Sequence, residues 1–271
     1  MGQCSGKAGG PDSPKQVEST PAAAAPAAKP AAEAAAAETP AAPTAVKKVL
    51  FVCTSADKFG PEDHATGVWL DEVACPFYAC VEAGHEILLA SIAGGEIPVD
   101  AASRGEGFYA PAAKKFDEDE KATGLLKSST KLADVDVTSF DAVYLPGGHG
   151  CCTDFVDNAE LKACIEHMFA ANKIVAACCH GPVALAQCVK PDGTPLVAGL
   201  RVSAFSDSEE GVVGHTEKVP WLLESKLKEL KAEYHFADDW NPAAVKDGCL
   251  ITGQNPQSSE KTVALLLEAL K

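Results

Sequence analysis

The sequence has few features of a membrane, secreted or nucleic-acid-binding protein. Aromatic residues make up 6% of the chain, and 23 Lys and Arg stand against 38 Asp and Glu, a net charge of −15. No basic cluster is present to match the phosphates of a nucleic acid, so we expect no nucleic-acid partner. No run reaches the ~18 apolar residues of a membrane-spanning helix, and residues 1–10 contain no apolar signal-peptide core. We therefore expect a cytoplasmic protein.

The sequence also contains no Cys-x-x-Cys pair, although it has 11 cysteines. This absence disfavours zinc-ribbon and thioredoxin-like sites, and a reducing compartment would keep the cysteines as thiols. Cys151 and Cys152 lie close to His149, but neighbours on one loop cannot complete a tetrahedral site. We predict no metal site here, and we expect most cysteines to pack as small apolar residues.

Residues 1–46 differ in composition from the rest of the chain. They are rich in Ala and are interrupted by Pro21, Pro26, Pro30, Pro40 and Pro43. Because proline breaks helices and this segment has little apolar surface to bury, we expect a disordered tail. The folded catalytic domain is predicted to span 47–271.

The first residues of the tail contain a candidate lipidation site. Gly2 follows the initiator Met, as in N-myristoylation, and Cys4 could carry a second acyl chain. Two chains anchor a protein stably, whereas one binds a membrane only marginally. Gly6 occupies the position where such motifs usually have Ser or Thr. Two alternatives therefore stay open, an unmodified start or a tether that holds the domain at a membrane surface.

From Lys47 onward, short apolar runs alternate with helical patterns. Strands alternating with helices form right-handed βαβ units, so we predict an α/β fold with a mostly parallel sheet covered by helices on both faces. Residues 93–140 have weak periodicity and are expected to form a partly helical insertion. The predicted strands are 49–52, 86–92, 141–145, 173–177, 201–205 and 250–252. The predicted helices are 68–81, 158–171, 221–230 and 259–270.

The segment after the strand at 173–177 is the most informative. Cys178 and Cys179 precede Gly181 and Pro182, which open a helix, so a cysteine lies on a sharp strand-to-helix turn typical of a nucleophile elbow. Cys178 is expected to be buried on the strand, which leaves Cys179 as the nucleophile. Amides at the helix start are expected to lower the pKa of its thiol.

Two further segments could complete this site. The glycine-rich turn at 147–150 follows the strand at 141–145, where its amides could stabilise an oxyanion beside Cys179. The first helix carries Asp71 and Glu72, and either carboxylate could transfer protons. The pattern does not decide between them.

Several segments together resemble one family. They are Thr66-Gly67-Val68-Trp69-Leu70-Asp71-Glu72, Pro146-Gly147-Gly148-His149-Gly150, Ala177-Cys178-Cys179-His180-Gly181-Pro182, 205–210 and 239–256. Over about 47–271 the chain resembles the PfpI-like superfamily, which has the class I glutamine-amidotransferase-like fold. It is most similar to the glyoxalase III group, relatives of heat-inducible chaperones and of the parkinsonism-associated deglycase. The resemblance implies a flavodoxin-like three-layer sandwich and a homodimer.

The resemblance also implies roles for individual residues. Cys179 is the implied nucleophile, with His180 beside it and Glu72 hydrogen-bonded to the thiolate. The backbone amides of Gly148 and His149 are the implied oxyanion donors.

A carboxylate that orients the histidine is part of the implied site. By the spacing of its segment it falls at Glu210, although Asp207 and Glu209 lie close enough in sequence to remain alternatives.

The implied activity is that of a glutathione-independent glyoxalase III, a lyase of the D-lactate dehydratase class. Such an enzyme converts the small dicarbonyls methylglyoxal or glyoxal to D-lactate or glycolate without a cofactor or metal. One alternative is an amide or peptide hydrolase or glutamine-amidotransferase-like enzyme, with His215 or His235 as the downstream histidine. Another is a holdase chaperone, or a redox sensor in which Cys179 is oxidised.

Overall fold

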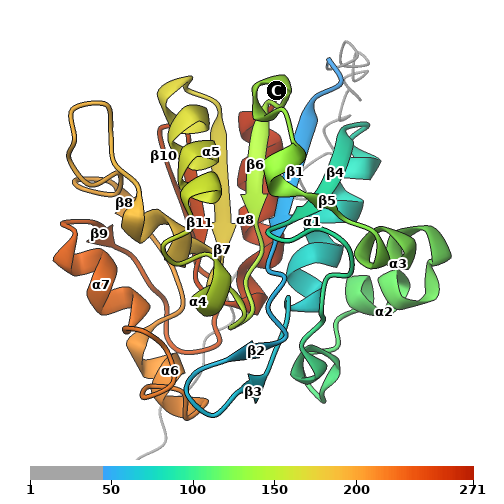
Figure 1. Cartoon of the computed structure of the whole chain (residues 1–271), viewed down its shortest axis with the longest axis horizontal. Coiled ribbons are helices and arrows are strands. Elements are labelled where there is room, and N and C mark those ends of the chain that lie inside the picture. The colour runs from blue at the N-terminus through green and yellow to red at the C-terminus, as the bar shows by residue number, and fades with distance from the viewer. Residues whose placement is uncertain (1–44) are drawn as a thin grey trace, which may run out of the picture. The chain divides into compact units, whose positions relative to one another are not determined.

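The computed structural model describes residues 45–271, and these residues are built around one mostly parallel sheet (Figure 1). The strand order is β10-β11-β7-β6-β1-β4-β5, and only β10 runs antiparallel to its neighbour. The strands are β1 Lys48–Cys53, β4 Glu86–Ser91, β5 Thr130–Lys131, β6 Ala142–Leu145, β7 Ile174–Cys178, β10 Ala244–Asp247 and β11 Leu250–Gly253.

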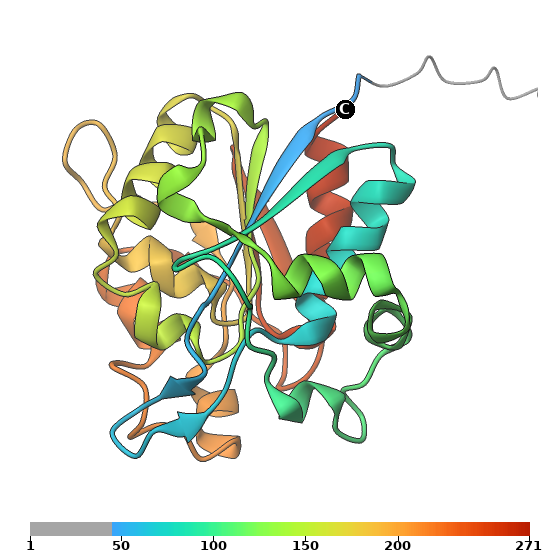
Figure 2. The same cartoon turned by 45° about the vertical axis from the view of Figure 1, so that its right-hand side comes forward.

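Helices cover both faces of this sheet, as the two views show (Figures 1 and 2). Helices α1, α2, α3 and α8 pack on one face, and α5 and α7 pack on the other. The predicted flavodoxin-like three-layer sandwich is confirmed. The helices are α1 Leu70–Glu82, α2 Pro111–Glu118, α3 Glu120–Lys127, α4 Cys151–Asp154, α5 Ala159–Ala170, α6 Asp207–Val212, α7 Leu223–Glu229 and α8 Ser259–Ala269.

Strand β1 shows why its continuous apolar run predicts a central strand. Side chains alternate across a strand, so Val49 and Phe51 pack against α1 while Leu50 and Val52 pack against the opposite helical layer. All four are buried, because helices cover both faces of the parallel sheet.

Smaller elements lie outside the main sheet. The hairpin of β2 and β3 lies near α6, at the end of the molecule toward which the parallel strands run (Figures 1 and 2). These elements are β2 Lys58–Phe59, β3 His64–Ala65, β8 Arg201–Val202, β9 Glu233–Tyr234, η1 Ala101–Arg104, η2 Leu132–Asp134, η3 Val137–Ser139, η4 Gly181–Gln187 and η5 Pro256–Ser258, where η marks a 3-10 helix.

One predicted strand of the main sheet is wrong. At 201–205 only the first two residues are extended, and they pair with β9 in a separate two-stranded sheet. The Ser203 N–H donates to the side-chain Oγ1 of Thr252, which takes it out of strand pairing. The expected insertion at 93–140 is partly helical and also supplies the edge strand β5.

The predicted tail lies outside the described residues up to position 44, and Gly2 and Cys4 lie outside them as well. Within 45–271, no helix combines the length and the apolar character needed to cross a membrane.

Candidate active site

The turn after β7 holds Cys179 in a strained conformation. Cys178 ends the strand fully buried, and Cys179 follows with φ 57°, in the left-handed region that non-glycine residues seldom adopt. Two backbone hydrogen bonds hold this turn: the Cys179 N–H donates to the Gly253 carbonyl (3.0 Å), and the Phe205 N–H donates to the Cys179 carbonyl (3.0 Å). Strain held in this way is typical of functional positions.

The helix that Gly181 and Pro182 open is the 3-10 helix η4, which is wound more tightly than an α-helix. Its first residue must be glycine, because a Cβ on Gly181 would lie 2.1 Å from the carbonyl oxygen of Leu145. This close approach brings the elbow against the end of β6, beside the turn at 147–150.

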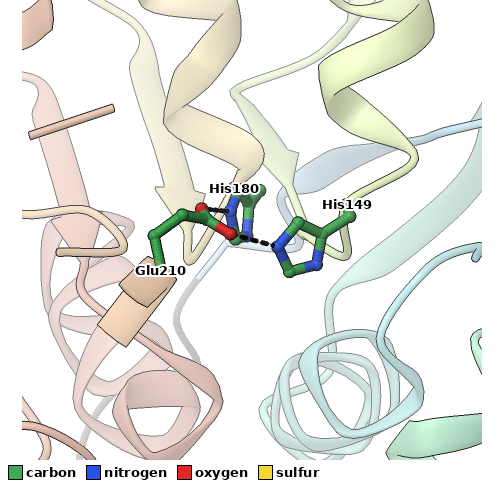
Figure 3. Close-up of side chains that lie close together, drawn as sticks. All are labelled: His149, His180 and Glu210. Atoms are coloured by element: carbon green, nitrogen blue, oxygen red, sulfur yellow. Dashed lines mark hydrogen bonds and ion pairs between the residues drawn. The ribbon is translucent and has the colours of Figure 1, made fainter. Parts of the chain in front are cut away.

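Cys179 contacts a chain of polar side chains. Its Sγ lies 3.3 Å from Nδ1 of His180, and His180 Nε2 lies 2.8 Å from Oε2 of Glu210. The other oxygen of Glu210, Oε1, lies 2.8 Å from Nε2 of His149, so one carboxylate bridges two imidazoles (Figure 3). His149, His180 and Glu210 are all buried.

The two other acidic candidates near Glu210 have different partners. The carboxylate of Asp207 accepts hydrogen bonds from Ser225, and Glu209 forms a capping box with Ser206 at the start of α6. Of the three, Glu210 is the residue that contacts His180. The sequence spacing favours Glu210 but does not reveal its second contact, with the imidazole of His149.

The charges of this group follow from its burial. Burial and the neighbouring His180 lower the pKa of His149 to about 3, so His149 is neutral at pH 7 and its Nε2–H donates to Glu210. Burial alone would raise the pKa of Glu210, but the two histidines outweigh it and hold the pKa below its usual value. Glu210 is therefore an anion that accepts hydrogen bonds with both oxygens.

Glu72 reaches the site from the first turn of α1. It is fully buried, and its Oε2 accepts a hydrogen bond from the Gly147 N–H (2.7 Å). Burial raises its pKa to about 8, and the Cys179 side chain interacts with its carboxylate. Asp71 lies instead along a separate pocket that also includes Glu260, so Glu72 is the carboxyl group beside the thiol.

The predicted lowering of the Cys179 pKa is wrong. Burial, together with the nearby carboxyl group of Glu72, raises the pKa of the thiol above its usual value. The short η4 does not offset this burial. At neutral pH, Cys179 is a thiol beside a largely protonated Glu72, and it needs a base to become a thiolate.

The turn after β6 presents two free backbone donors. Gly148 has φ +100°, and a Cβ at this position would lie 2.1 Å from the carbonyl oxygen of Gly67, so only glycine fits. Within 45–271, neither the Gly148 N–H nor the His149 N–H donates to another protein group. Both can therefore bind an oxyanion in the adjacent cavity.

The cavity has a volume of about 200 Å³ and is lined by Cys179, Gly148 and His149. The sequence argument did not identify the rest of its wall, because these residues come from segments far apart in the chain. Trp69, Phe205 and Trp240 do lie within the motifs that carry the family resemblance. The wall also includes His64, Trp69, Phe108, Phe205, His215 and Trp240.

One group of described side chains could offer ligands to a metal. Single atoms of His149, His180 and Glu210 lie within 4.8 Å of one another. The same side chains already hydrogen-bond one another. Cys151 is not part of this group, and its thiol donates to the Pro146 carbonyl.

Comparisons with known proteins identify relatives that are named as glyoxalases. The chain is 29% identical to "Glyoxalase 3" of Candida albicans over 83% of its length and 98% of that protein. It is 30% identical to a "Glutathione-independent glyoxalase" of Schizosaccharomyces pombe, over 79% of this chain and 92% of the relative.

Solved structures of other proteins also align with this chain. The crystal structure of glyoxalase III from Candida albicans aligns with a TM-score of 0.76 and 28% identity, covering 83% of this chain and 98% of the other. The Rapid Encystment Protein of Francisella tularensis aligns with a TM-score of 0.80 and 35% identity, covering 83% and 100%. A family model described as DJ-1/PfpI matches residues 65–269, so the chain belongs to the DJ-1/PfpI family.

Proposed function

We propose that this chain is a glutathione-independent glyoxalase that converts methylglyoxal or glyoxal to D-lactate or glycolate. The observation that carries the proposal is the elbow thiol of Cys179, held between His180 and Glu72 and facing two free backbone N–H groups across a small cavity. The names of the relatives support the same activity.

The first step is addition of the thiol to the aldehyde carbon. His180 Nδ1 lies 3.3 Å from Sγ and accepts the thiol proton, and the Glu210 anion on Nε2 stabilises the imidazolium that forms. The carbonyl oxygen becomes the oxyanion of a hemithioacetal and accepts hydrogen bonds from the Gly148 and His149 amides.

The second step moves a proton from the aldehyde carbon to the neighbouring carbonyl carbon through an enediol. His180 returns the thiol proton to the hemithioacetal oxyanion and then removes the proton from the aldehyde carbon, while Glu72, largely protonated at neutral pH, protonates the neighbouring carbonyl oxygen to give the enediol. His180 then protonates the neighbouring carbon, and Glu72 recovers its proton from the hydroxyl group on the former aldehyde carbon. The result is a thioester of the 2-hydroxy acid, which water hydrolyses to release Cys179. The net reaction adds one water to the dicarbonyl and needs no external oxidant or reductant, as expected of the D-lactate dehydratase class.

The geometry gives less support to the alternative activities. An amidotransferase-like site would use a downstream histidine, but the thiol contacts His180, whereas the His215 ring lies beside His149 at 4.8 Å. Redox sensing is disfavoured because Cys179 is 3% exposed and burial raises the pKa of its thiol.

The test is D-lactate formation from methylglyoxal without added glutathione. We expect Cys179→Ser to lower kcat/KM by about 10³-fold or more. Cys249→Ser is the matched control, because Cys249 precedes β11 at the end of the sheet away from the elbow, and it should retain full activity. Equal D-lactate formation by wild type and Cys179→Ser would refute the proposal.

We also propose that the protein acts in the cytoplasm as a homodimer, and that acylation at Gly2 and Cys4 can tether it to a membrane. The support is the family resemblance for the dimer and the sequence of the first residues for the tether. Light scattering coupled to size exclusion would test the dimer, since a monomeric mass at micromolar concentration would contradict it.

A further inference from the structure

Trp240, on the cavity wall, adopts an unusual backbone conformation. Its φ is 63°, in the left-handed region where a bulky residue is a genuine outlier. Its N–H donates to Oε1 of Glu209 at 2.9 Å, and the same oxygen accepts from Nδ2 of Asn255 at 2.7 Å. The strained position is therefore fixed by side chains of two other segments.

Glu209 accepts hydrogen bonds with both carboxylate oxygens, one of which holds the backbone of Trp240. It is fully buried, and its Oε2 accepts a hydrogen bond from the Ser206 N–H at 3.0 Å. A buried carboxylate is costly unless it is hydrogen-bonded, and the hydrogen bonds of Glu209 join the start of α6 to the backbone of Trp240. Gln254 adds a second restraint, because its side chain bonds both the N–H and the carbonyl of Ala237.

Trp240 belongs to a connected set of aromatic rings. Its ring centroid lies 5.7 Å from that of Phe108 and 5.8 Å from that of Phe205, and Phe108 lies 5.2 Å from Trp69. All these contacts are edge-to-face, with interplanar angles of 66° to 87°. We call these residues, Trp69, Phe108, Phe205 and Trp240, the aromatic box.

The aromatic box is larger than the dicarbonyl of the proposed reaction requires. The cavity volume of about 200 Å³ equals roughly the liquid volume of seven water molecules, while methylglyoxal adds only one methyl group to the dicarbonyl unit. With the reacting aldehyde at Cys179, a methyl group would leave much of the box without contacts. A planar ring would bury against the aromatic side chains.

We infer that the preferred substrates are aromatic 2-oxoaldehydes, with the dicarbonyl at Cys179 and the ring in the aromatic box against Trp240. This inference rests on the proposed function and specifies its substrate class. The atom balance is unchanged: the aryl 2-oxoaldehyde takes up one water and leaves as the aryl 2-hydroxy acid. Trp240 contacts the substrate, and Glu209 is a positioning residue that acts through Trp240.

The kinetic test compares phenylglyoxal with methylglyoxal. We expect kcat/KM for phenylglyoxal to exceed that for methylglyoxal by about tenfold or more. Trp240→Ala, and the less drastic Trp240→Leu, should remove most of this preference by raising KM for phenylglyoxal several-fold more than KM for methylglyoxal. Phe236→Ala is the control, because that aromatic side chain is 63% exposed. Equal kcat/KM values, or equal losses for both substrates in the Trp240 variants, would overturn the inference.

Glu209→Gln tests the positioning role. Glutamine keeps the size of the side chain but replaces one accepting oxygen with a donor. We expect KM to rise more for phenylglyoxal than for methylglyoxal, whereas general damage would lower kcat/KM equally for both substrates and overturn this role.

A binding experiment separates this inference from the proposed function. In the Cys179→Ser protein, quenching of tryptophan fluorescence would report binding of the two products, because two of the 3 tryptophans line the cavity. Mandelate should bind at least about tenfold more tightly than lactate. If methylglyoxal is turned over but mandelate has no advantage, the aromatic inference fails alone. If mandelate binds tightly but wild type turns over neither dicarbonyl, the proposed function fails and the aromatic binding site stands.

Discussion

Glu210 accepts hydrogen bonds from two buried imidazoles and influences the reactivity of Cys179 without contacting its thiol. His180 lies between Cys179 and Glu210, with Nδ1 toward the thiol and Nε2 toward the carboxylate. Since Glu210 also holds His149, whose backbone N–H faces the cavity, the base and one oxyanion donor share a single anchor. A change at Glu210 should therefore affect proton transfer and oxyanion binding together.

Glu210→Gln tests this coupling. His149 and His180 bind different oxygens of Glu210, and glutamine replaces one of them with an NH2 donor, so one imidazole loses its acceptor and the neutral amide cannot stabilise an imidazolium by charge. We expect kcat with methylglyoxal to fall by about 10²- to 10⁴-fold. Asp207→Asn, in the same helical turn but bonded to Ser225, should stay near wild type. Similar losses in both variants would mean that α6 acts only as a scaffold.

Glu72 should make stability depend on pH in a predictable direction. Burial raises its pKa from 4.5 to about 8, so the folded state binds more protons than the unfolded state between these values. This contribution to the free energy of unfolding therefore decreases as pH rises from about 5 to 8. Glu72→Gln keeps an acceptor for the Gly147 N–H and does not titrate. The stability of Glu72→Gln relative to wild type should rise with pH, by at most about 1.4 kcal/mol per unit.

Urea unfolding at pH 5.5, 6.5 and 7.5 would measure this difference. Glu82→Gln, at the exposed end of the same helix, is the control and should follow the wild-type pH profile. A stability difference between Glu72→Gln and wild type that is constant across this range would show that Glu72 is ionised in the folded protein.

At the scale of elements, the turn between β6 and α4 is constrained by the backbone opposite. A Cβ at Gly148 would lie 2.1 Å from the Gly67 carbonyl oxygen, whereas a Cβ at Gly95, which also has positive φ, would meet nothing within 4 Å. Gly95→Ala should cost only the backbone strain, about 1–2 kcal/mol. Gly148→Ala should lower the free energy of unfolding by at least about 2 kcal/mol more and lower D-lactate formation sharply. Equal effects in urea unfolding would contradict this account.

The elements that could be predicted from sequence are those with burial on both faces. β1, β6 and β7 appear as continuous apolar runs because helices cover both sides of them. β10 was missed because Ala-Val-Lys-Asp at a sheet edge has no such run. The error at 201–205 came from a tertiary contact, the Ser203 bond to Thr252, which no local pattern contains.

At the scale of the whole molecule, the family and fold could be predicted because several motifs of the family occur in the same order along this chain. The contacts between these segments could not be predicted from the sequence. Only the fold brings α6 against the turn at 147–150, so the bridge from Glu210 to His149 has no signal in either segment. The same holds for the burial that raises the pKa of Cys179, since it depends on the packing of every neighbouring segment.

Every site residue identified in the structure lies at or beyond His64, and the family match begins at residue 65. A chain lacking residues 1–44 should therefore keep the kcat, KM and melting temperature of the full chain. If the tail acts as a lipid tether, Gly2→Ala should move the protein from the membrane fraction of cells to the supernatant, because one acyl chain without its partner binds only marginally.

Cys4→Ser should likewise release most of the protein, since it retains only the chain at Gly2 and one chain binds a membrane only marginally and reversibly. Neither variant should alter D-lactate formation by purified protein. Fractionation of cells that express wild type, Gly2→Ala and Cys4→Ser at equal levels would measure the effect. A wild-type protein found wholly in the supernatant would exclude the tether, and lost activity in the truncated chain would show that the first 44 residues contribute to the site.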